Sequence, residues 1–98
     1  MPGFDVELHP AAVEEAKAAR EWYAARSPGA ADAFTQELDA AIDRIREGPE
    51  RWAEYLHGTR RYLLRRFPFL IIYTFSPSAI RIVAVAHAKR RPGYWKGR

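Results

Sequence analysis

Several features are missing from this sequence of 98 residues. It has no cysteine, which excludes disulfides and thiolate metal sites and suits a reducing compartment. No apolar run approaches the roughly 20 residues that a membrane-spanning helix needs. The first five residues lack the basic lead and apolar stretch of a signal peptide. We therefore expect a cytoplasmic protein with no membrane partner.

Acidic residues are missing from almost half of the chain. Residues 1–54 contain 12 Asp/Glu and 6 Lys/Arg, whereas residues 55–98 contain 10 Lys/Arg and no carboxylate. The two balances, −6 and +10, combine to the net charge of +4. Cations without counter-ions repel one another, so we expect a basic surface that meets an acidic partner. Nucleic acid and an acidic protein segment are the two candidates.

The first half of the chain predicts one strand and two helices. Phe4 to Leu8 alternates apolar and acidic residues, which is typical of a half-buried strand near a sheet edge. Pro10 opens a helix that continues from Ala11 to Arg26, and Ser27-Pro28-Gly29 ends it. A second, amphipathic helix carries apolar residues from Phe34 to Ile45 and stops at Gly48-Pro49. The short connection favours an antiparallel helical hairpin.

Three strands are predicted in the second half, at Arg60 to Phe67, Phe69 to Phe75 and Ile80 to His87. The middle one is apolar on both faces and belongs in the sheet centre. We therefore predict a single α+β domain over residues 1–98. It has a short N-terminal strand, a helical hairpin, and a three-stranded antiparallel sheet with the helices packed on one face. The other face would be open.

The last strand offers a candidate for chemistry. By alternation, Arg81, Val83, Val85 and His87 share one face, and the aliphatic residues on the other face suit packing under helices. Arg81 and His87 are then expected on the open face. A histidine there can transfer protons near neutral pH. The alternative is a histidine at a strand end that bonds to the backbone.

Arginines on the preceding strand form a second group. Arg61 and Arg65 share one face and are spaced to hold successive phosphates or carboxylates through bidentate hydrogen bonds. The alternative is an edge strand whose charges guard against aggregation.

The segment after His87 is basic and aromatic: Tyr94 and Trp95 stand among Lys89, Arg90, Arg91, Lys96 and Arg98. The aromatic rings would stack on bases while the cations hold the backbone. Alternatively, the two rings anchor a tail that folds back on the domain.

Other polar groups predict no site. Glu47, Glu50 and Glu54 cluster near the end of the second helix and favour a solvated surface, the alternative being a general base beside the basic face. The three histidines are scattered and no carboxylates have ligand spacing, so we expect no metal and no cofactor.

Two runs carry a family resemblance. They are Arg61-x5-Phe67-Pro68-Phe69-x-Ile71-x-Tyr73 and Ile82-x2-Val85-x-His87-x2-Arg90-Arg91-x3-Trp95. With the helix and Gly48-Pro49 before them, they resemble the RelE/ParE superfamily. Its members are the toxins of type II toxin–antitoxin, or plasmid-stabilisation, systems. The resemblance covers nearly the whole chain. It implies a small toxin neutralised by an antitoxin segment, and the basic half of the chain suits such a partner.

The resemblance leaves the target open. RelE-like members cleave messenger RNA on the ribosome, without a metal, as mRNA interferases, and ParE-like members inhibit DNA gyrase. In the nuclease branch, Arg61 and Arg81 match arginines that hold phosphate. His87 and Tyr94 would be the acid and base, supported by Arg90 or Arg91. This chain lacks the lysine pair of that branch.

In the gyrase branch no catalytic group is needed, and the tail and helix surfaces would recognise the target. Nucleic-acid or partner binding is expected at Arg65, Lys89, Arg90, Arg91, Trp95 and Arg98. A third possibility, a nucleic-acid-binding module without toxicity, explains the charge alone.

Overall fold

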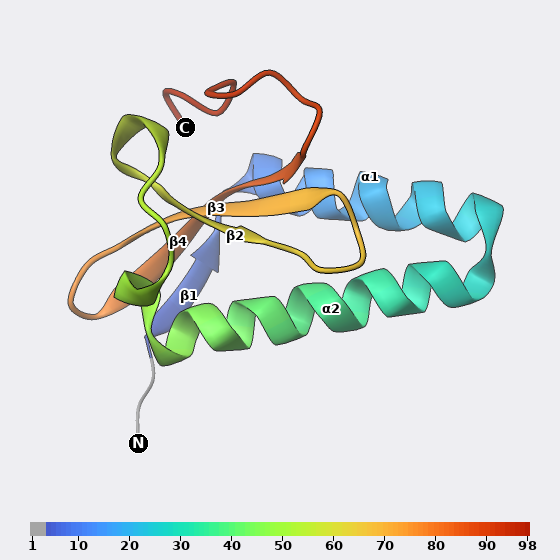
Figure 1. Ribbon diagram of the computed structural model, residues 1–98, viewed down its shortest axis with the longest axis horizontal. Helices are drawn as coiled ribbons and strands as arrows, with labels where there is room; N and C mark the ends of the chain where they lie inside the picture. Colours follow the sequence, from blue (N-terminus) through green and yellow to red (C-terminus); the bar gives the residue numbers. More distant parts are fainter. Residues whose placement is uncertain (1–3) are drawn as a thin grey trace.

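Two helices pack across one face of a four-stranded sheet in the computed structural model, which describes residues 4–98 (Figure 1). The elements in chain order are β1 (Asp5–Leu8), α1 (Pro10–Arg26), α2 (Pro28–Glu47), β2 (Arg60–Leu63), β3 (Phe69–Phe75) and β4 (Ala79–His87). Short 3₁₀ turns at Pro49–Arg51 and Leu56–Gly58 join α2 to β2. The predicted α+β order of elements is confirmed.

Prolines place both helix starts. Pro10 is in the first turn of α1, and the His9 Nδ1 caps that helix by accepting from the Ala11 N–H at 3.0 Å. Ser27 is extended and separates the helices, and α2 starts directly at Pro28. The helix α2 therefore begins before Phe34, the first residue of the apolar repeat from which it was predicted. Neither helix in residues 4–98 has the length and apolarity of a membrane span.

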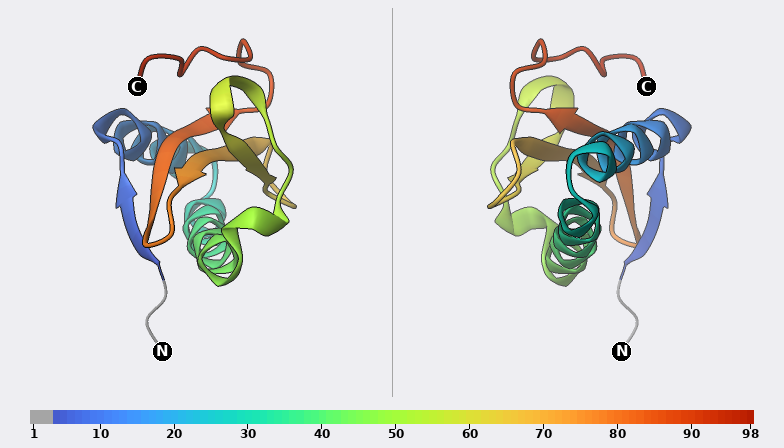
Figure 2. Two further views of the ribbon diagram at one scale, coloured as in Figure 1. Left: turned by 90° about the vertical axis from the view of Figure 1, so that its left-hand side faces the viewer. Right: turned by 90° about the vertical axis from the view of Figure 1, so that its right-hand side faces the viewer.

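The strand order is β1-β4-β3-β2, with β1 parallel to β4 and the other pairs antiparallel. The N-terminal strand thus lies at the sheet edge, as predicted, and it makes the sheet mixed. In the interior strand β3, Ile71, Ile72 and Tyr73 are fully buried. One core lies between the sheet and the helices, and a second cluster lies on the opposite side, where the tail crosses the sheet (Figure 2).

A β-bulge in β4 changes which residues face the helices. Ile72 pairs with Ala84, but the next residue, Tyr73, pairs with Ile82, so Val83 is an extra residue in β4. Ile82 and Val85 pack in the helix-side core, whereas Val83 and Ala84 both pack in the opposite cluster. The expectation of strict alternation along this strand was therefore wrong. After the bulge, the positions whose side chains face the helices are shifted by one residue along β4.

The strand predicted at Arg60 to Phe67 ends early, at Leu63. The carboxylate of Glu37 in α2 accepts hydrogen bonds from the backbone N–H groups of Arg65 and Arg66, and it forms an ion pair with Arg66 Nε at 3.0 Å. These bonds hold the chain in a bend, so Arg65 is not on a strand.

The centre of the sheet is tied to the end of α2 by one buried hydroxyl. Tyr73 is fully buried, and its hydroxyl donates to the Pro49 carbonyl at 2.6 Å. Burial raises the pKa of Tyr73 to about 12, so it remains a neutral donor.

We predict that Tyr73→Phe lowers the free energy of unfolding by about 1–2 kcal/mol, because a buried carbonyl loses its donor. Urea unfolding measures the change. Tyr23→Phe is the matched control: its ring stacks on Phe34, but its hydroxyl forms no hydrogen bond within residues 4–98. Equal stabilities of the two variants would contradict the assigned role of Tyr73.

Candidate functional site

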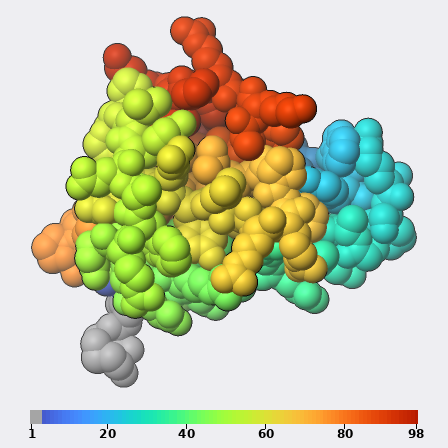
Figure 3. All heavy atoms as spheres, viewed as in Figure 1, coloured from blue at the N-terminus to red at the C-terminus, as the bar shows by residue number. Residues whose placement is uncertain are grey.

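The sheet face predicted to be open is covered by the C-terminal tail. Trp95 is only 3% exposed and packs with Ile72, Val83, Ala84 and Ala86. The tail, red in Figure 3, lies along one side of the molecule next to residues of the 50–65 region. Of the two interpretations of the tail, the one in which the aromatic rings anchor it on the domain is confirmed. Trp95 is therefore a core residue.

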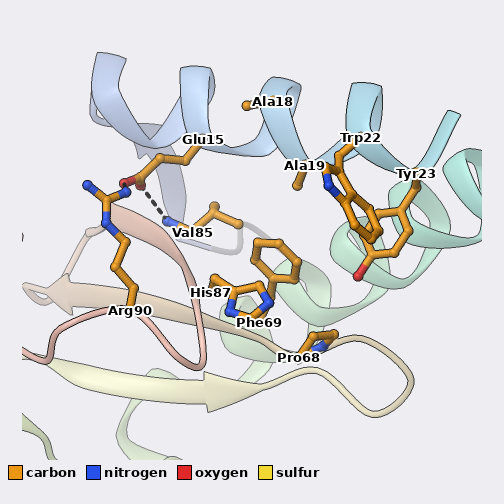
Figure 4. A pocket seen from close by; sticks show the side chains of 10 residues that line it. All are labelled: Glu15, Ala18, Ala19, Trp22, Tyr23, Pro68, Phe69, Val85, His87 and Arg90. Atoms are coloured by element: carbon orange, nitrogen blue, oxygen red, sulfur yellow. Dashed lines mark hydrogen bonds and ion pairs between the residues drawn. The ribbon is translucent and has the colours of Figure 1, made fainter. Parts of the chain in front are cut away.

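One carboxylate fixes this tail. Glu15 of α1 accepts from the Tyr94 hydroxyl at 2.7 Å and pairs with both terminal nitrogens of Arg98 at 2.9 and 3.0 Å. Arg90 Nη1 lies 3.3 Å from Glu15 Oε2. Glu15 also accepts from the backbone N–H of Val85 at 3.0 Å, as Figure 4 shows. We call Glu15, Arg90, Tyr94 and Arg98 the Glu15 cluster.

The protonation of the Glu15 cluster follows from these contacts. Burial by itself raises the pKa of Glu15, but hydrogen bonds from Arg98, Tyr94 and the Val85 N–H outweigh burial and hold the pKa below its usual value. Burial and the bond to Glu15 raise the pKa of Tyr94. Tyr94 is therefore a neutral phenol whose hydroxyl donates a hydrogen bond to the Glu15 carboxylate.

Glu15 was not among the residues predicted from sequence, yet a signal was present. It lies three residues after Ala12 and four before Ala19, the two buried residues of α1, and so shares their helix face. A carboxylate on an otherwise apolar helix face requires a buried partner. That partner is the tail, which is distant in sequence.

His87 lies on the helix side of the sheet, because the bulge at Val83 shifts the strand phase. Its ring packs edge-on against Phe69, with centroids 5.1 Å apart. It lines a groove of about 420 Å³ beside α1, together with Trp22 (Figure 4). Its Nδ1 accepts from the Lys89 backbone N–H at 3.1 Å. The expectation that His87 lies on the open face was wrong, and the alternative of a strand-end histidine bonded to backbone describes it.

The two arginines matched to phosphate-holding residues lie on the opposite face. Arg61 pairs in register with Ile72, whose side chain is on the tail side, and its guanidinium lies 4.6 Å from the Tyr55 ring centroid. Arg81 lies between Ile80 and Ile82, which face the helices, so it points the other way. The structure brings neither arginine together with His87.

Part of the basic half of the chain is paired with acids of the first half. All four ion pairs found in residues 4–98 join an acid from the first 54 residues to an arginine from the remainder. The acids are Glu15, Glu37 and Glu54, and the arginines are Arg60, Arg66, Arg90 and Arg98. This half has no carboxylate of its own, as its sequence shows, but four of its ten cations are paired with acids of the first half. Within the described residues, the bases outside these pairs are Arg61, Arg65, Arg81, Lys89, Arg91 and Lys96.

We predict that Glu15→Gln lowers the free energy of unfolding by about 2 kcal/mol at neutral pH, because charged hydrogen bonds to the tail are lost. A lowered folded pKa gives stability that is present above the ordinary glutamate pKa and disappears as pH falls through the lowered value. The difference between the variant and the parent should therefore shrink in acid.

Urea unfolding at neutral and acidic pH measures this dependence. The pKa of Glu37 is also lowered by its bonds to Arg66 and Arg65, despite burial, so part of the acid sensitivity should remain in the variant. The control is Glu14→Gln, an exposed neighbour. A loss of stability that is the same at both pH values would refute the charge-based role of Glu15.

Comparisons with known proteins agree with this fold. The family model described as "ParE toxin of type II toxin-antitoxin system, parDE" matches residues 6–92. No curated protein matches. A solved chain described as "Chromosomal ParDE TA system from P. aeruginosa" matches with a TM-score of 0.77 and 17% identity, over 88% of this chain and 97% of that one. That likeness shows the shared fold. Because the family model covers most of the sequence, the chain belongs to the ParE toxin family of type II toxin–antitoxin systems.

Proposed function

We propose that this toxin inhibits DNA gyrase by binding to it and does not cleave messenger RNA. A toxin of a type II system has a cognate antitoxin, so the partners are that antitoxin and the target. The observation that carries the choice of target is the separation of His87 from Arg61 and Arg81 by the thickness of the sheet.

Cleavage of RNA by its own 2′-hydroxyl needs several groups around one phosphate. A base takes the hydroxyl proton, an acid protonates the leaving oxygen, and cations stabilise the charge that develops. Here the candidate acid and base, His87, cannot reach a phosphate held by Arg61 and Arg81 on the other face. Tyr94 is the other candidate, but its hydroxyl already donates a hydrogen bond to Glu15 Oε2, with the two oxygens 2.7 Å apart. A binding mechanism needs none of these groups together.

The exposed cations of the tail are the recognition elements in this proposal. Lys89 and Arg91 are exposed and form no ion pair within residues 4–98. Arg90, Trp95 and Arg98 instead hold the tail in place through the Glu15 cluster and the buried side chain. The tail thus presents Lys89 and Arg91 on a fixed backbone, which reduces the entropy lost on binding.

We predict that His87→Asn leaves toxicity within about twofold of the parent chain, because no proton transfer is required of this residue. The asparagine Oδ1 can accept the Lys89 N–H in place of Nδ1, so the strand end keeps its hydrogen bond. Growth arrest after induction in a bacterial host without antitoxin is measured together with plasmid supercoiling and messenger RNA ends.

The expected result is arrest with loss of negative supercoiling and intact messages, in both the parent and the variant. New codon-phased cuts in translated messages that disappear in His87→Asn would overturn the proposal and favour the nuclease branch.

We also predict that Lys89→Gln/Arg91→Gln raises the concentration needed for half-inhibition of purified gyrase by about 10-fold, since two charged contacts are lost. Lys17→Gln/Arg20→Gln is a control of equal charge on the exposed side of α1. Inhibition by the tail variant at the same concentration as the control would show that the target is recognised elsewhere. Deleting the tail is a poorer test, because it also removes the buried Trp95.

A further inference from the structure

A second basic surface borders the tail, since Ala88, the residue before Lys89, is part of its lining. It is a hollow of about 860 Å³ between the end of α2, the 3₁₀ turn after it, β2 and the bend that follows. Arg44, Arg51, Arg61 and Arg65 line it, and Glu47 is the one carboxylate among the residues that do so. We call it the arginine hollow. Two of its arginines precede residue 55, so the charge imbalance of the two halves did not reveal it.

The arginine hollow has an excess of positive charge, with four arginines and one carboxylate in its lining. None of its four arginines takes part in an ion pair in the part of the chain that the structure describes. Arg44 is positioned by a hydrogen bond from Nη1 to the Tyr62 hydroxyl at 3.0 Å, and Arg61 by the Tyr55 ring. These neutral partners orient the guanidinium groups and leave their charge unchanged. Glu37 accepts a hydrogen bond from the backbone N–H of Arg65.

The aromatic rings in the hollow pack against other side chains of the protein. Tyr55 contacts the Trp95 ring, with centroids 5.5 Å apart, as well as the Arg61 guanidinium. Trp52 packs edge-on against Tyr62, with centroids 4.6 Å apart. Proteins that bind single strands rely on aromatic faces that stack on bases. The arginine hollow instead offers forked N–H donors, which match phosphate oxygens in pairs.

We propose that the arginine hollow binds the phosphate backbone of duplex DNA, without regard to sequence. Duplex DNA carries a dense line of negative charge, about one per 1.7 Å, so a single stretch of it can meet several arginines together. Contacts to phosphate fix position and carry no base information. This inference goes beyond inhibition of gyrase. DNA binding is measured with no gyrase present, and each proposal can fail without the other.

The experiment measures binding of the full chain to a fluorescein-labelled duplex of about 20 base pairs by anisotropy, between about 50 and about 200 mM NaCl. Four phosphate contacts predict a slope of log K against log salt of about −3.6, which weakens binding about 100-fold over that range. A single strand of the same length, ATP and an oligoglutamate peptide serve as unlabelled competitors.

Arg51→Gln/Arg65→Gln is the test variant, since neither side chain forms a hydrogen bond or ion pair in the described residues and the fold should be unaffected. Lys17→Gln/Arg20→Gln is the control, with the same loss of charge on exposed positions of α1 outside the hollow. We expect the test variant to bind at least about 10-fold more weakly than the parent. The magnitude of its slope of log K against log salt should decrease by about 2, while the control changes little.

Several outcomes would overturn the proposal. Equal losses in the two variants would mean that binding follows net charge alone, and no binding at the lowest salt would exclude a DNA site. Displacement by ATP at equal phosphate concentration would indicate a nucleotide pocket. Competition by oligoglutamate as strong as that by the duplex would indicate a site for an acidic protein segment.

Discussion

The free edge of β4 is the constraint on which the arrangement of this molecule depends. β1 pairs with β4 only as far as Leu8 and Ile82, because Pro10 starts α1. Beyond that point the carbonyl of Val83 and the N–H of Val85 have no strand beside them, and buried backbone groups require partners. Arg98 donates to the Val83 carbonyl at 3.1 Å, and Glu15 accepts from the Val85 N–H at 3.0 Å. One ion pair thus takes the place of a further strand, and it joins the tail, α1 and the sheet.

The order of elements could be predicted because its signals are local. Proline marks the helix starts, and the apolar run of β3 indicates a strand buried on both faces. The face of His87 could not be predicted in this way. It depends on how β4 pairs with β3, and Val83 and Ala84 are small apolar residues that suit either side of a sheet. The early end of β2 depends on Glu37, which is distant in sequence.

The uneven distribution of charge has a structural role as well as a recognition role. Acids of the first half form ion pairs with arginines of the second half in all the pairs of the described chain. Such pairs favour the contacts between halves over contacts within each half. Of the second-half cations that remain, Lys89, Arg91 and Lys96 lie in the tail, Arg61 and Arg65 line the arginine hollow, and Arg81 lies in neither. A count of charges along the sequence could indicate a basic surface. Which cations stay unpaired, and where they lie, depends on the folded structure.

The parallel pairing of β1 with β4 has a consequence for how the chain folds. The register places Asp5 beside Ala79 and Leu8 beside Ile82, so the two strands meet only after a long loop is closed. Folding rates fall as contacting residues become more distant along the chain. On the ribosome, β1 emerges first and has no strand to pair with until β4 has been made. The sheet of the toxin can therefore be completed only after β4 has been made.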